Sequence, residues 1–161
     1  MEWNWTDSVI GPTGYPRESF FSFRPNQKID KIVISYGTPS NLIIVGLTFF
    51  SSNEDGSTDT LTIGGGGKDS VVIRKDTVLF DGANEYLTGI SGRFSVFDDP
   101  TSPILYCIKF TTNLRETRMY GVELQSSPLF NLNAPDGDKI VGFLGRSGPY
   151  INALGVYHTK A

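Results

Sequence analysis

Short apolar runs recur along the whole chain, and clusters of Gly, Pro, Asn and Asp separate them. The side chains at Ile32, Ile34 and Tyr36 alternate with Val33 and Ser35, a period of two that is typical of a half-buried antiparallel strand. With 18 glycines, 9 prolines and 12% aromatic residues, the pattern predicts an all-β fold of about a dozen strands. The predicted strands span residues 20–23, 29–36, 43–51, 59–63, 70–73, 77–80, 86–96, 105–111, 119–124, 139–144 and 153–158.

The length of the chain predicts one domain over residues 1–161, since this size supports a single substantial core. A net charge of −3 and a pI near 5.1 provide no basic field for phosphates, so nucleic acid is excluded as a partner. No stretch approaches the ~20 apolar residues of a membrane span, and we therefore expect no membrane insertion.

The N-terminus begins with an acidic segment, residues 1–7, in which no apolar run follows a basic start. That start does not resemble a signal peptide. The single cysteine, Cys107, excludes an intramolecular disulfide and leaves no cysteine cluster for zinc. Both observations favour a reducing, cytoplasmic location, with release by an unconventional route as the alternative.

The last part of the chain carries the most specific pattern. Two strand-like runs, 140–144 and 153–157, flank a turn-rich segment over residues 145–152, and this arrangement predicts a hairpin. Its loop would present main-chain N–H groups, the aromatic Tyr150 and the amide of Asn152 at a sheet end. Such groups bind sugar hydroxyls without reacting with them, so the hairpin predicts a binding site rather than an active site.

The same hairpin resembles the carbohydrate site of the jacalin-related lectins, in which a Gly, three variable residues and an Asp precede the final strand. The matching residues are Gly148, Pro149, Tyr150, Ile151 and Asn152, with an amide in place of the acid. Further matches in the same order extend the resemblance from Gly11 to Tyr157. They lie at residues 28–32, 85–92, 110–113, 120–121 and 128–132.

The resemblance implies a jacalin-like β-prism I fold, with three four-stranded antiparallel sheets around a pseudo-threefold axis and the first strand in the same sheet as the last. It also implies binding of mannose- or glucose-type glycans and glycoproteins without metal or cofactor, and assembly into a homodimer or larger oligomer. Mannose is expected rather than galactose because the galactose-specific relatives depend on a free amino-terminal Gly made by chain cleavage, and this chain runs uncut there.

By the same resemblance, the main-chain N–H groups of Tyr150 and Ile151 and the side chain of Asn152 bind the 4- and 6-hydroxyls of the sugar. Pro149 has no N–H to donate. Asn152 lacks the charge of an Asp, which predicts weaker binding or an altered preference, by about 1 kcal/mol per hydrogen bond.

The first loop is expected to lie beside this hairpin and share the sugar. Gly14 ends a segment that resembles the start of the family's Gly-rich loop, but Arg17 or Glu18 stands where a further glycine would approach the sugar. A side chain there either contacts the sugar or obstructs it, and the sequence leaves both open. Phe97 and Asp98 correspond in position to the family's specificity loop. They either contact the sugar or are a core Phe beside an ordinary acidic turn, and the sequence leaves both open.

The sequence offers no support for catalysis. The one histidine, His158, lies beyond the last strand core, and Cys107 lies in an apolar run, so no triad of nucleophile and base can be assembled. The glycine run at 64–67 lacks the spacing of a phosphate loop. We therefore expect a non-enzymatic lectin; the alternative is a protein-interaction β-prism module that has lost sugar binding.

Overall fold

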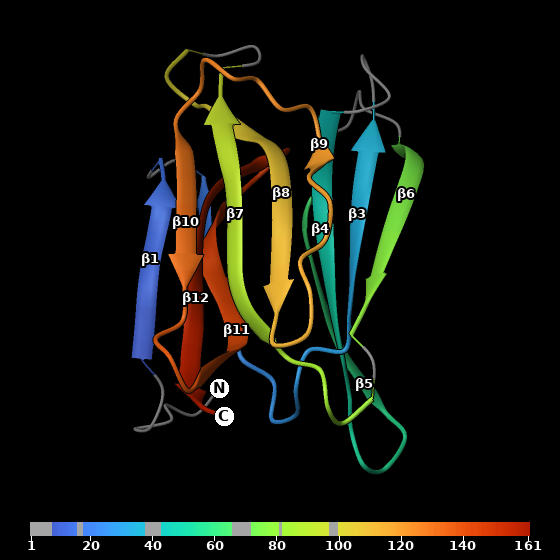
Figure 1. Cartoon of the computed structure of the whole chain (residues 1–161). Helices are drawn as coiled ribbons and strands as arrows, with labels where there is room; N and C mark the ends of the chain where they lie inside the picture. The colour runs from blue at the N-terminus through green and yellow to red at the C-terminus, as the bar shows by residue number, and fades with distance from the viewer. Residues whose placement is uncertain (1–7, 16–17, 38–42, 66–71, 81, 97–99) are drawn as a thin grey trace.

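The described residues of the chain form twelve strands in three four-stranded antiparallel sheets (Figure 1). This computed structural model describes residues 8–15, 18–37, 43–65, 72–80, 82–96 and 100–161. Within these ranges no segment forms a helix of the length and hydropathy that a membrane span needs.

Each sheet contains a central antiparallel hairpin with one further strand on either side. The first sheet has the order β1 (Ser8–Gly14), β12 (Ile151–Lys160), β11 (Asp138–Ser147), β2 (Ser19–Phe23). The second has the order β5 (Thr58–Gly64), β4 (Ile43–Ser52), β3 (Lys31–Gly37), β6 (Val72–Leu79). The third has the order β10 (Leu129–Asn133), β7 (Leu87–Ser95), β8 (Ile104–Thr112), β9 (Tyr120–Gly121). The three-sheet arrangement confirms the expected fold class, and the pairing of β1 with β12 confirms that the first strand joins the last.

One core lies between the three sheets and receives the alternate, inward-facing residues of their strands. Phe49 of β4 stacks on Phe143 of β11 with ring centroids 4.5 Å apart, and on Phe23 of β2 at 5.9 Å. Phe110 of β8 is fully buried in the same core. Stacked aromatic rings from different sheets hold the prism together because they bury large apolar areas at one centre.

Several strand predictions need correction. The strands predicted from the apolar pattern include neither β1 nor β10. The family resemblance implied a first strand paired with the last, and it matched residues 128–132 without predicting a strand there. The two short strands expected at 70–73 and 77–80 are one strand, β6, and the strand expected at 119–124 is reduced to the two residues of β9. The hairpin loop expected over 145–152 is much shorter, because β11 continues to Ser147 and β12 begins at Ile151.

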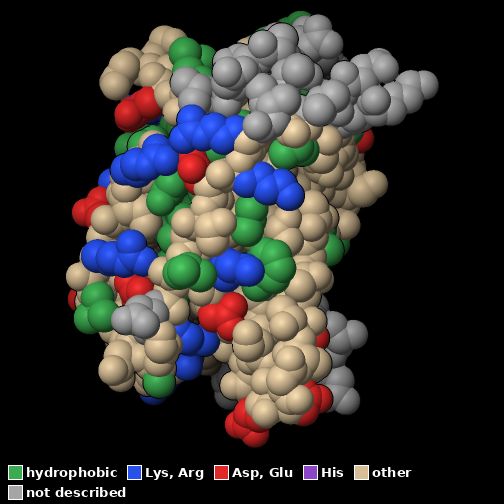
Figure 2. Space-filling model, turned by 90° about the vertical axis from the view of Figure 1, so that its right-hand side faces the viewer, with side chains coloured by type: hydrophobic (Ala, Val, Ile, Leu, Met, Phe, Trp, Pro, Cys, Tyr) green, Lys and Arg blue, Asp and Glu red, His purple; other side chains and the backbone are tan. Residues whose placement is uncertain are grey.

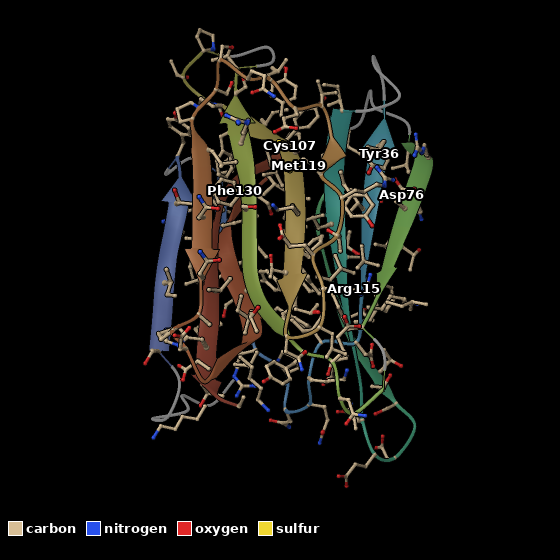
Figure 3. The ribbon with its side chains drawn as sticks, viewed as in Figure 1. Tyr36, Asp76, Cys107, Arg115, Met119 and Phe130 are labelled. Atoms are coloured by element: carbon tan, nitrogen blue, oxygen red, sulfur yellow. The ribbon has the colours of Figure 1, made fainter. Side chains whose placement is uncertain are left out.

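Charged side chains on the outside are mixed in sign. Figure 2, which views the right-hand side of Figure 1, shows Lys and Arg side chains with Asp and Glu between them. Asp76 of β6 illustrates this mixing: Tyr36 of β3 donates to its carboxylate at 2.9 Å, and Arg74 and Arg118 lie 3.2 and 3.0 Å from the same oxygen (Figure 3). Such pairing breaks up any uniform field over this face.

Candidate carbohydrate site

The tip of the β11–β12 hairpin consists of Gly148, Pro149 and Tyr150. The N–H of Gly148 donates to the carbonyl of Tyr150 at 3.0 Å and closes the turn. Pro149 is exposed at the tip, whereas Ile151 is buried in the core, so only the main chain of Ile151 is available to a ligand. The tip lies at the upper end of the prism in Figure 1, together with the ends of β1 and β7.

Asn152 is the second residue of β12, and its side chain is buried rather than displayed on the loop, with 2% of the residue exposed. Its amide Nδ2 donates to the hydroxyl of Ser102 at 2.9 Å and to the carbonyl of Pro103 at 3.1 Å. The carbonyl of Pro103 can only accept, which sets the orientation of the amide. The other side-chain atom, Oδ1, is buried and has no hydrogen-bond partner among the described residues.

The main chain of Asn152 joins the hairpin to the first loop. Its carbonyl accepts from the N–H of Tyr15 at 2.9 Å, and Gly14 pairs with Ala153 in the β1–β12 ladder. Gly14 has φ of +117°, and a Cβ there would lie 2.4 Å from the Asn152 carbonyl oxygen, so the position requires glycine. Three segments that are far apart in the sequence thus meet at Asn152.

Tyr150 does not stand free at the loop. The residue is half-buried and packs against a small apolar cluster formed by Ile43, Val45, Ile104 and Tyr106. The pKa of Tyr106 is raised by burial and, to a lesser extent, by Tyr150. The apolar packing holds the tip of the hairpin against the second and third sheets.

Glu18 extends the site from the first loop. The structure does not describe Arg17, the other residue considered there, but it places the Glu18 side chain directly against Gly148: a Cβ on that glycine would lie 2.6 Å from Oε2. Arg146 donates to the Glu18 carbonyl at 3.2 Å. Phe97 and Asp98, the remaining predicted contacts, lie outside the described residues.

A cleft of about 270 Å³ is lined by the end of β1, the end of β7 and the start of β10. β1 and β10 lie side by side in Figure 1. Tyr15, Phe94, Leu129 and Phe130 line the cleft, and Tyr15 meets Phe94 edge to face at 6.4 Å. A larger hollow of about 580 Å³ lies on the second sheet around Phe50 and contains none of the predicted sugar contacts.

Sequence reasoning correctly brought Gly14 together with the hairpin, and it missed Ser102, Pro103 and Tyr15. No local signal marks Ser102 or Pro103, because their contacts to Asn152 span 50 and 49 residues. The sequence also offers a hairpin at residues 82–89 as a second place for a sugar. In the structure its acid is engaged, because Arg115 and Thr112 both donate to the Glu85 carboxylate at 2.8 Å.

The chain forms a three-sheet β-prism in which the first and last strands are paired. Groups able to bind a ligand lie together at one end of it, as in a β-prism of the lectin type. Residues 10–157 match the model of the jacalin-like lectin domain, and the chain therefore belongs to this family.

Relatives match the chain over almost its full length. It is 47% identical over 152 residues to the jacalin-related lectin Calsepa of Calystegia sepium. This match covers 94% of this chain and 95% of Calsepa. A crystal structure of Calsepa lectin in complex with a biantennary N-glycan aligns with a TM-score of 0.88 at 44% identity, covering 96% of this chain and 97% of the other. The structure of a mannose-binding jacalin-related lectin from Ananas comosus aligns with a TM-score of 0.75 at 26% identity, covering 97% and 99%.

Proposed function

We propose that this protein is a lectin that binds mannose- or glucose-type glycans at the upper end of the prism, in a site formed by the hairpin tip, the first loop and the segment just before β8. The family supports carbohydrate binding, and relatives named for complexes with an N-glycan or for mannose binding support the sugar class. The described residues of the proposed site are Gly14, Gly148, Pro149, Tyr150, Ile151 and Asn152.

The observation that carries this proposal is the environment of Asn152. Buried polar atoms in native proteins are nearly always hydrogen-bonded, so a buried atom without a partner points to a ligand, a water molecule or a functional role. Within the described part of the chain, the Asn152 Oδ1 atom is such an exception. A sugar hydroxyl can donate to such an oxygen, but Oδ1 is closed off from solvent in this structure, so this contact requires the loops over it to move apart. By the family resemblance, these loops are the segments that bind the sugar.

We propose that the site binds sugar without catalysing a reaction on it. An amide such as that of Asn152 neither gives nor takes a proton at neutral pH, and its nearest side-chain partner, Ser102, accepts from it. The one histidine of the sequence, His158, lies toward the other end of β12, where its Nδ1 atom is 2.6 Å from Asp138. The side-chain and main-chain groups that the Asn152 amide contacts, Ser102 and Pro103, are therefore not proton-transfer groups.

The test is a glycan array probed with the intact protein, with an Asn152→Ala variant and with an Asn53→Ala control. Asn53 lies in the β4–β5 turn at the lower end of the prism, and its side chain donates an exposed hydrogen bond to Ser57. We expect mannose- or glucose-containing glycans to bind the intact protein and the control, and free methyl α-mannoside to compete.

Loss of these signals in the Asn152 variant, with its folding checked by circular dichroism, would support the site. Signals that survive in that variant would place the sugar elsewhere on the prism. An array with no signal for the folded intact protein would contradict the lectin function and favour a module that binds proteins.

A further inference from the structure

Glu18 adopts a backbone conformation that costs free energy. Its φ is +68°, and among the described residues it is the only one other than glycine with a positive φ. Residues with a Cβ avoid this region because of steric crowding, and they persist there where the surrounding structure or a function requires it. Such an outlier is a reason to examine what the residue does.

The Glu18 side chain lies against the hairpin tip at Gly148. A Cβ built on Gly148 would lie 2.6 Å from Oε2, 2.8 Å from Cδ and 2.9 Å from Cγ of Glu18. The absence of a side chain at Gly148 is what makes room for the carboxylate. Arg146 holds the main chain of Glu18 by donating to its carbonyl, and its guanidinium lies over the ring of Phe20, 5.9 Å from the centroid.

The charge of this carboxylate is available to a ligand. Glu18 is exposed, and in the described part of the chain no salt bridge engages its carboxylate. By contrast, Asn152, at the other end of the same tip, has no charge and uses its amide N–H groups on Ser102 and Pro103. The tip thus has a carboxylate at its first residue and an uncharged acceptor just beyond its last.

We propose that Glu18 is the acidic residue of the sugar site. Its carboxylate accepts hydrogen bonds from hydroxyls of a glycan bound over the hairpin tip and supplies the charge that Asn152 lacks. Hydrogen bonds to a charged acceptor are about twice as strong as neutral ones, so this contact is a main source of affinity. The inference rests on the proposed lectin function.

The same charge selects among glycans. A carboxylate at the tip repels uronic acids, sialic acids and sulfated sugars, because it would face a second negative charge in a partly desolvated site. The ligands that fit are neutral hexoses with adjacent free hydroxyls. Removal of the charge should therefore weaken binding of neutral sugars and relax the exclusion of acidic ones.

The first experiment measures affinity for methyl α-mannoside, and for the best neutral array glycan, by titration calorimetry on Glu18→Gln. Glutamine keeps the size and loses the charge, and we expect affinity to fall about tenfold or more. Glu54→Gln is the control, because it removes the same charge from the β4–β5 turn at the lower end of the prism, and its affinity should equal that of the unaltered protein.

A second variant separates binding from folding. Glu18→Gly relieves the unfavourable φ, so its melting temperature should rise while its affinity falls. A residue with only a structural role would not shift the two measurements in opposite directions. Gly148→Ala should also weaken binding, because the new methyl group displaces the Glu18 side chain, and combining it with Glu18→Gln should add little further loss.

The outcomes distinguish this inference from the lectin function itself. If the unaltered protein binds neutral glycans and Glu18→Gln binds them equally well or more tightly, Glu18 is not the acid of the site and the inference is overturned. If the unaltered protein binds no glycan on the array, the lectin function fails and this inference fails with it.

Discussion

The side-chain amide of Asn152, on β12, donates a hydrogen bond of 3.1 Å to the carbonyl of Pro103, which lies 49 residues earlier, just before β8. With the second bond to Ser102, it ties the β7–β8 connection to the final hairpin. An aspartate at this position would turn a carboxylate oxygen toward that carbonyl. The amide therefore suits its neighbours better than a carboxylate would. It has a structural role in addition to the sugar contact proposed for it.

Asn152→Asp should destabilise the protein and fail to improve sugar binding. The buried carboxylate loses the donor to Pro103 and faces a carbonyl oxygen, which costs about 1–3 kcal/mol in the free energy of unfolding. Urea denaturation measures this loss, and calorimetry measures affinity. Ser102→Ala, which removes one partner only, should cost less. A variant that is both as stable and tighter-binding would contradict the role given to the amide.

Gly14→Ala should destabilise the protein by more than about 2 kcal/mol, because it adds a steric clash with the Asn152 carbonyl to an unfavourable φ. Gly56→Ala is the matched control: Gly56 also has a positive φ, of +89°, but a Cβ there meets nothing within 4 Å. The control should lose only about 1 kcal/mol. Thermal unfolding of the two variants isolates the clash, and equal losses would argue against it.

Asp76→Asn should lower stability at neutral pH and lose its effect in acid. The pKa of Asp76 lies below its ordinary value: burial acts to raise it, but the hydrogen bond from Tyr36 and the charges of Arg74 and Arg118 lower it by more. A carboxyl with a lowered native pKa stabilises the fold above its ordinary pKa, and this contribution is lost as pH falls through the native value.

We expect Asp76→Asn to lower the free energy of unfolding by about 1 kcal/mol at pH 7. Urea titrations across the acid range, with the exposed Asp136→Asn as a control, should show the gap to the unaltered protein closing as pH falls. A gap that stays constant down to the lowest pH would show that the carboxylate charge contributes nothing.

Cys107 should resist thiol reagents in the native protein. Burial raises the pKa of its thiol to about 11, so at pH 8 the residue is both inaccessible and protonated (Figure 3). Labelling by a chromogenic disulfide reagent should be slow without denaturant and complete within seconds in concentrated urea. Fast labelling of the native protein would show that β8 opens readily.

The sequence prediction failed where Gly and Pro residues suggest a turn but lie inside a strand. Residues 11–14 contain Gly and Pro and read as a turn, yet they belong to β1. β1 lies at the edge of its sheet, where a strand tolerates proline because one row of its N–H groups needs no partner. Gly145 likewise reads as a turn residue, but it sits inside β11 where a Cβ would lie 2.0 Å from the Ala153 carbonyl oxygen.

In β6, charged residues misled the strand prediction in the same way. Arg74 and Asp76 interrupt an apolar pattern, which predicts a break between two strands. The strand is continuous because these side chains pair with one another and with Tyr36 and Arg118 at the margin of the sheet. A pattern of apolar residues does not reveal such a partner from another part of the chain.

The sequence by itself determined the all-β class, the prism architecture through its family motifs, and the hairpin at Gly148 as the place where a sugar is expected. Period-two burial and turn residues are local, so they can be read along the chain. Only the tertiary structure decided how the site is assembled. Asn152 points inward because Ser102 and Pro103 receive it, and Glu18 lies on the tip because Gly148 has no side chain. Both contacts join segments that are distant in sequence, and only packing brings them together.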